Sequence, residues 1–154
     1  MSILSEDMKR VVREQRLAYV ATVCADGSPN LSPKGNIRVW DDSHLIFADF
    51  CSPGTMQNLA ANPAIEINVV DAFARRGYRF KGKASVIAQG PVFDSAIQLY
   101  SNGEQGTQNG IASMIRSIVM VEVEQAQAVV SPGYVPGVTE EQMKKQWSGY
   151  YNSL

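Results

Sequence analysis

Hydrophobic residues alternate with polar ones, or form short apolar runs, along most of the chain, and both patterns are typical of β-strands. Six segments of this kind can be recognised, and we predict strands at residues 17–24, 31–40, 45–50, 64–70, 77–88 and 116–130. Turn signals such as Asp26-Gly27 separate several of these segments by only a few residues, which favours antiparallel hairpins. The pattern therefore predicts a mainly β fold.

Helix signals lie between and around these strands. Hydroxyl residues or a proline stand at the expected first positions, and we predict short helices that begin near Ser5, Thr55, Pro91 and Thr139. The last of them carries the spacing of a capping box, with Gln142 three residues after the threonine. Residues 104–110 contain no apolar residue and are predicted to be loop.

The order of these elements limits the possible folds. Six strands in mainly antiparallel, hairpin-linked order, interrupted by short helices, predict a closed or partly closed β-barrel decorated with helices. Strand and helix do not alternate regularly, which argues against a doubly wound nucleotide fold. The glycines Gly103, Gly106 and Gly110 do not follow a strand and form no dinucleotide-binding turn.

Composition narrows the class of protein further. With 154 residues, 45% hydrophobic and 19% charged, residues 1–154 are predicted to form one globular domain. A net charge of -1 gives no general basic field, so neither nucleic acid nor a membrane surface is expected as a partner.

The two cysteines, Cys24 and Cys51, lack metal-ligand spacing, and His44 is the single histidine. We expect a cytoplasmic protein with free thiols, because the first residues lack the pattern of a signal peptide.

Residues 45–62 form the first candidate site. An apolar strand runs into the breaker Ser52-Pro53-Gly54, and a helix start follows at Thr55. Backbone amides at a helix N-terminus, beside the hydroxyls of Ser52 and Thr55, are suited to bind a phosphate group. Taken alone, the same stretch is also compatible with an ordinary capped turn between a strand and a helix.

Polar ladders on two predicted strands form the other candidates. In residues 31–40 one face carries Ser32, Lys34, Asn36 and Arg38, and in residues 77–88 one face carries Arg79, Lys81 and Lys83. Either ladder is also compatible with a solvated outer face of a barrel. If adjacent strands bring both ladders to the loop at Ser52, cations, hydroxyls and an amide would surround a phosphate and a flat polar ring. Gly35 would allow such a ring to approach the backbone.

Residues 17–35, 45–70 and 78–86 resemble a known family. They are similar to the split-barrel flavoproteins of the pyridoxamine 5'-phosphate oxidase-like group, which bind FMN at a homodimer interface. The resemblance covers roughly residues 8–130. It implies a six-stranded antiparallel split barrel of the FMN-binding type and a homodimer.

The resemblance also implies roles for individual residues. The strand that follows the ribityl chain and the isoalloxazine ring would supply Ser32, Pro33, Lys34, Gly35 and Asn36. The phosphate would lie at Ser52 and Thr55, and Arg116 would approach the flavin of the other subunit. Relatives often carry a cation where this chain has Gly54, so Lys34, Arg79 or Lys81 must supply the missing charge.

The implied function is binding of FMN in a small flavin-dependent oxidoreductase or reductase, which would use NAD(P)H or a small organic substrate. True pyridoxamine phosphate oxidases are longer and close with a segment of Trp and Arg residues for the substrate phosphate, whereas this sequence closes with KKQWSGYYNSL. That reaction is therefore not expected. Alternatives are a non-catalytic flavin carrier, an interaction barrel without cofactor, and a deazaflavin or heme in the same cleft.

Overall fold

The computed structural model describes residues 2–102 and 111–154, so the loop predicted at residues 104–110 lies outside the described residues. The strands are β1 Ala18–Val23, β2 Pro29–Lys34, β3 Arg38–Val39, β4 His44–Asp49, β5 Ala64–Asp71, β6 Arg76–Ile87 and β7 Ser117–Val130. The helices are α1 Glu6–Gln15, α2 Pro53–Ala61, α3 Pro91–Ser101 and α4 Glu140–Asn152, with a 3-10 turn at Ile111–Met114.

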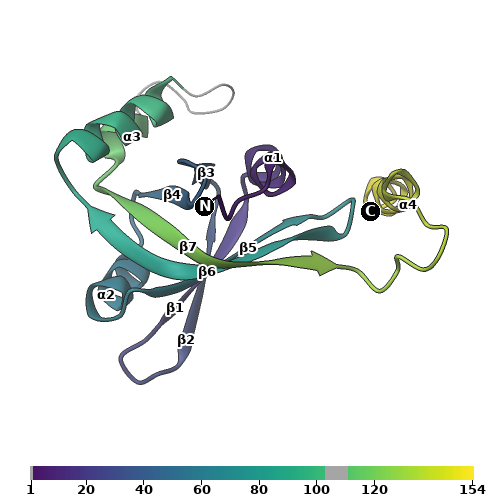
Figure 1. The fold of residues 1–154 in the computed structure, drawn as a ribbon, viewed down its shortest axis with the longest axis horizontal. Coiled ribbons are helices and arrows are strands. Elements are labelled where there is room, and N and C mark those ends of the chain that lie inside the picture. Colours follow the sequence, from purple (N-terminus) through teal and green to yellow (C-terminus); the bar gives the residue numbers. More distant parts are fainter. Residues whose placement is uncertain (1, 103–110) are drawn as a thin grey trace.

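The strands form one curled antiparallel sheet in the order β2-β1-β5-β6-β7-β4-β3. The long strands β6 and β7 arch through the molecule, with α3 near one end of the arch and α4 beyond the other (Figure 1). Helix α2 lies close to the hairpin of β1 and β2, against which it packs. This architecture confirms the prediction of a mainly β split barrel with short helices.

The predicted strand 31–40 is wrong as a single element, because it is divided into β2 and β3 and the sheet has seven strands rather than six. A turn at Gly35-Asn36 separates the two halves. The side-chain nitrogen of Asn36 donates to the backbone carbonyl oxygen of Ala48 (2.9 Å). The hydroxyl of Tyr100 donates to the backbone carbonyl oxygen of Asn36 (2.9 Å). At this turn these two bonds take the place of backbone hydrogen bonds between paired strands. The chain crosses here from β2 at one edge of the sheet to β3 at the other edge.

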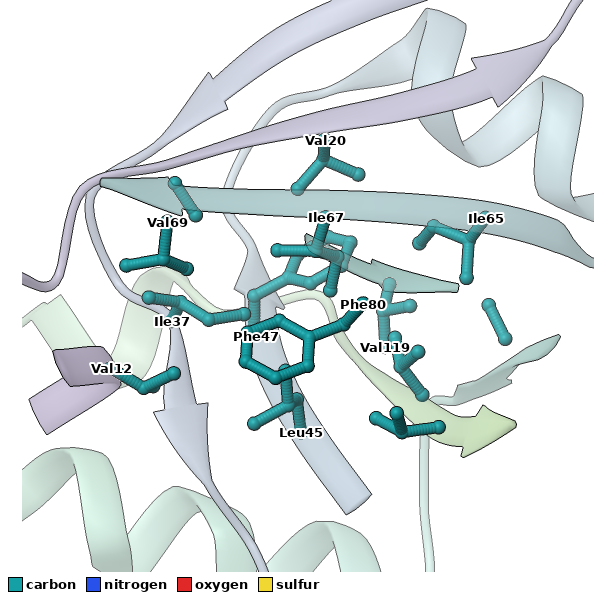
Figure 2. Packing of buried hydrophobic residues seen from close by; sticks show 14 of the residues in the cluster. Val12, Val20, Ile37, Leu45, Phe47, Ile65, Ile67, Val69, Phe80 and Val119 are labelled. Atoms are coloured by element: carbon teal, nitrogen blue, oxygen red, sulfur yellow. The ribbon is translucent and has the colours of Figure 1, made fainter. Parts of the chain in front are cut away.

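The main hydrophobic core lies on the concave side of the sheet, where side chains from several strands meet those of α1 and α2. Figure 2 shows Phe47 of β4 beside Phe80 of β6 at its centre, with Val20 and Ile67 nearby. These four side chains have no exposed surface. The apolar strand predicted at residues 45–50 is therefore confirmed as a buried strand.

Strand β4 is buried on both faces. Its alternate residues Ile46 and Ala48 pack into a second cluster with Tyr100 of α3 and Ile118 of β7. Because β4 is fixed from both sides, the loop that follows it leaves the sheet at a defined point. That loop starts helix α2 and carries the first candidate site.

Candidate functional site

Helix α2 begins beside the end of β4, two residues earlier than predicted, with Pro53 at its first position and Ser52 as the N-cap. Proline suits this position because it has no N–H to satisfy. The carboxylate of Asp49, which is 6% exposed, accepts the backbone N–H of Ser52 at 2.8 Å. This bond fixes the loop and accounts for an acidic residue at the end of an apolar strand. Thr55 consequently lies in the first turn and is buried.

Lys34 is the charged group at the centre of the site. Its ammonium group donates to the hydroxyl oxygens of Ser32 (3.0 Å) and Ser52 (2.6 Å), so β2 and the start of α2 are joined through one cation. The side chain is only 7% exposed and also lies over the ring of Phe47, 5.9 Å from its centroid. We call Ser32, Lys34 and Ser52 the lysine cluster.

The electrostatics of the lysine cluster favour an anion. Burial lowers the pKa of Lys34, and the negative charge of Asp49 partly opposes this shift. Within the described residues, no carboxylate lies within 4.0 Å of the Lys34 ammonium. Both serine hydroxyls use an oxygen lone pair to accept from Lys34, so their protons are available to a further acceptor. A buried cation with neutral partners is poorly compensated, and a bound anion would compensate it.

A second polar group follows the same face of β2. The hydroxyl oxygen of Thr22 accepts hydrogen bonds from the side-chain amides of Asn30 (3.2 Å) and Asn58 (3.0 Å). Next to these amides lies a groove of about 520 Å³ between α2 and the turn joining β1 to β2. Thr22, Asn30 and Asn58 are not among the site residues predicted from the sequence, although the side chain of Asn30 points to the same side of β2 as those of Ser32 and Lys34.

The cation Arg79 does not join the lysine cluster. Across the sheet, Tyr19 of β1 is paired with Pro33 of β2 on one side and with Asn68 of β5 on the other, and Asn68 is paired with Arg79. Paired residues share a face, and adjacent residues along a strand point to opposite faces. Arg79 is therefore on the face of Pro33, opposite to Lys34.

Lys81 shares that outer face, and both cations are engaged there. The carboxylate of Glu66 contacts the guanidinium of Arg79 at 3.0 Å and the ammonium of Lys81 at 3.5 Å. The expectation that all three polar features converge is therefore wrong within one chain. The ladder of β2 and the loop at Ser52 meet, and the ladder of β6 faces the other way.

The remaining predicted residues lie next to the lysine cluster along the chain or beside the loop that follows β4. Pro33 is exposed on the outer face, and Gly35 and Asn36 form the turn that ends β2. The side-chain oxygen of Asn36 is buried and has no hydrogen-bond partner in the described chain. Arg116 is exposed just before β7, and its backbone N–H donates to the carbonyl oxygen of Asp49 (2.9 Å), which places it beside the same loop.

Other candidate chemistry is limited. Cys24 is half-buried and Cys51 is exposed, and both thiols are free. In residues 2–102 and 111–154, no three His, Cys, Asp or Glu side chains gather in a way that could hold a metal ion. None of the helices in these ranges is long and apolar enough to cross a membrane.

The curled antiparallel sheet, in which the chain passes at Gly35-Asn36 from one edge to the other, has the architecture of a split barrel, and a buried cation lies at the start of α2. The chain belongs to the pyridoxamine 5'-phosphate oxidase family, whose model matches residues 4–129. This match confirms the family that residues 17–35, 45–70 and 78–86 indicated.

Solved structures are similar to most of the chain. HupZ of Group A Streptococcus is 32% identical, with a TM-score of 0.70 over 82% of this chain and 94% of that chain. An FMN-binding protein of Syntrophomonas wolfei (16% identity, TM-score 0.67, 83% and 87% coverage) and an F420 reductase (21%, 0.61, 80% and 98%) share the fold. The sequence matches no curated protein.

Proposed function

We propose that this protein binds FMN with its phosphate at the lysine cluster and the first turn of α2, and that it is a small flavin-dependent oxidoreductase. The observation that carries the proposal is the buried Lys34, whose nearest polar partners are two neutral hydroxyls. A phosphate would receive a charge-assisted hydrogen bond there, together with the amides of a helix N-terminus.

The other residues of the site fit a flavin ring. The buried side-chain oxygen of Asn36 lacks a donor, and the polar edge of the ring offers an N–H group. Gly35 has no side chain, and the position of a Cβ atom there would have no other atom within 4 Å. A flat ligand can therefore approach the backbone at this turn. When bound, the flavin supplies two-electron redox chemistry, while the protein binds and orients it.

Solution spectroscopy tests this function. Purified protein that shows the visible absorption of oxidised flavin, and that releases FMN on denaturation, would support the proposal. Bleaching of that absorption by NAD(P)H would identify a reductase, whereas an unbleached yellow protein would be a flavin carrier. Release of a deazaflavin or heme instead of FMN would contradict the assignment of the cofactor.

We expect a homodimer. Large apolar side chains are exposed on the outer face of β1 and β2, with Tyr19 46% and Leu31 65% exposed, and Leu17 beside them. Contiguous apolar surface of this kind commonly marks a protein interface. Sedimentation should give a dimer at micromolar concentration. A monomer with flavin bound would contradict this expectation.

Thr55→Val should weaken FMN binding selectively. The substitution keeps the shape of a buried side chain and removes a hydroxyl donor from the first turn of α2. Loss of one hydrogen bond to a charged group costs about 1.5 to 3 kcal/mol, or roughly ten- to a hundredfold in affinity. Isothermal titration should show this loss for FMN and almost none for riboflavin. Equal losses for both ligands would mean that the hydroxyl does not contact the phosphate.

FMN affinity should fall at alkaline pH. Burial places the pKa of Lys34 below its ordinary value in the ligand-free protein, and a bound anion would raise it by favouring the charged form. Binding then takes up a proton once pH exceeds the pKa of the free protein, so affinity falls as pH rises through it. Titrations between about pH 7 and about pH 10 should show this slope for FMN. The same slope for riboflavin would assign it to another group.

A further inference from the structure

A groove of about 520 Å³ lies between α2 and the turn that joins β1 to β2. Gly54 lines the groove and lies two residues after Ser52, which contacts Lys34. Sites for small molecules usually measure about 300 to 1,000 Å³, so this groove is far larger than a phosphate requires. It can hold a further part of a ligand whose phosphate is bound at the lysine cluster.

The groove is lined by side-chain amides with free hydrogen-bonding atoms. Asn30 and Asn58 each use their amide nitrogen to donate to Thr22, which leaves their oxygens as acceptors. Gln57 is exposed, and neither end of its amide is engaged within the described chain. Side-chain amides of Asn and Gln match the adjacent donor and acceptor of an adenine edge. Small residues, among them Ala25 and Ala61, leave room for a flat base.

The charge of the groove is negative rather than positive. None of its lining residues is Lys or Arg, and Asp26 is its charged member. One carboxylate oxygen of Asp26 accepts from the backbone N–H (3.0 Å) and the hydroxyl (2.6 Å) of Ser28. These bonds lower the pKa of Asp26 and keep it ionised. The second oxygen can accept from a ribose hydroxyl, as acidic residues do in dinucleotide sites. A ligand with a phosphate group on that ribose, such as NADPH, would be repelled by Asp26.

We propose that this groove is an adenosine subsite and that the cofactor phosphate at Lys34 belongs to an adenine dinucleotide. The proposal rests on the proposed function, because it uses the same phosphate site. Asn30 and Lys34 lie on one face of β2, about 13 Å apart along the strand, which leaves room for a ribose and a base beyond the phosphate. The dinucleotide is either FAD, the extended form of the flavin, or NADH.

Binding of FMN, FAD, NADH and AMP should be measured by isothermal titration on the full chain and on three variants. Gln57→Leu removes the free amide, Ala61→Trp fills the far end of the groove, and Gln146→Leu is a matched exposed control on α4. FAD should bind at least roughly tenfold more tightly than FMN, because its adenosine would form additional hydrogen bonds in the groove. Gln57→Leu should reduce this preference for FAD, and Ala61→Trp should abolish it. The affinity of both variants for FMN should equal that of the wild type, and Gln146→Leu should bind all four ligands as the wild type does.

The other outcomes separate the two proposals. If FAD and FMN bind equally but NADH and AMP bind and are weakened by Ala61→Trp, the subsite stands and its ligand is a nicotinamide dinucleotide. If FMN binds while no adenine ligand responds to Ala61→Trp, the subsite is overturned and the proposed function remains. If no flavin binds, the proposed function fails, and AMP binding weakened by Ala61→Trp would still support an adenosine site.

Discussion

Lys34→Met is expected to weaken FMN binding by about 2 to 4 kcal/mol, or roughly 30- to 1,000-fold, because it removes the buried cation of the lysine cluster. Methionine keeps most of the apolar stem, so the packing against Phe47 is retained. The dependence of FMN affinity on salt concentration should also become flatter. Isothermal titration of the apo-variant at low and high salt measures both effects.

The same substitution should stabilise the ligand-free protein. Burial disfavours the charged form of Lys34, and no carboxylate within the described residues pairs with it at salt-bridge distance. Its pKa is lower in the folded than in the unfolded chain, so the unfolded state binds more protons and the stability of the wild type rises as pH passes through the folded pKa. Urea denaturation at neutral pH should therefore give a higher midpoint for the variant than for the wild type.

Lys83→Met is the matched control. Lys83 lies on β6, its side chain is 65% exposed, and its ammonium contacts the Glu124 carboxylate at 3.2 Å. Exposed ion pairs contribute little, so FMN affinity should change less than about twofold. If Lys83→Met weakens FMN as much as Lys34→Met does, the phosphate is bound on the basic face of β6 and the assignment to Lys34 is wrong.

Gly82→Ala is expected to have the largest effect on stability. Gly82 lies at an irregularity in the pairing of β6 with β7, and a Cβ atom added there would overlap the backbone carbonyl of Glu122. The obstacle is main chain in the centre of the sheet, so relief requires a shift of a strand. We expect a loss of about 3 kcal/mol or more, measured by urea denaturation.

Gly149→Ala provides the comparison for this result. At Gly149, in α4, an added Cβ contacts nothing within 4 Å, and alanine favours a helix more than glycine does. Its free energy of unfolding should rise by about 0.5 to 1 kcal/mol. A Gly82→Ala protein as stable as the wild type would show that the two strands are less closely paired than described.

Local sequence patterns were sufficient to predict the strands but not the division of residues 31–40. The alternation in this segment is regular through Gly35, so the pattern favours one strand. What ends β2 is the pairing of Asn36 with Ala48 and Tyr100, which are 12 and 64 residues away in sequence. No local pattern contains these contacts. The buried β4, in contrast, is apparent from its continuous apolar residues.

Two parts of the candidate site are predictable from the sequence, namely those that depend on the alternation of side chains along one strand and on the start of a helix. The alternation of side chains places Ser32 and Lys34 on one face of β2, and the segment Ser52-Pro53-Gly54 ends the preceding strand and starts α2 beside them. The alternation within one strand does not tell which face of a distant strand meets that site. The sequence therefore allows Arg79 to lie with Lys34, whereas the pairing through β1 and β5 places Arg79 on the opposite face.

The hydrogen-bonded group of Thr22, Asn30 and Asn58 is not predictable from the sequence for a different reason. Asn58 lies on α2 one turn after Thr55, where a polar residue normally faces solvent. It is instead only 8% exposed and donates to Thr22 of β1, a contact that depends on how α2 packs on the hairpin. A threonine, Thr22, within the apolar segment 17–24 is a sequence signal that a polar partner is needed.

The ratio of the dissociation constants of riboflavin and FMN tests the central claim most directly, because the two ligands differ by the phosphate alone. The wild-type protein should bind FMN at least roughly a hundredfold more tightly than riboflavin, since the phosphate gains a buried cation and a helix N-terminus. In Lys34→Met this preference should fall to below about tenfold. Equal affinity of the wild type for both flavins would contradict the assignment of the phosphate to Lys34.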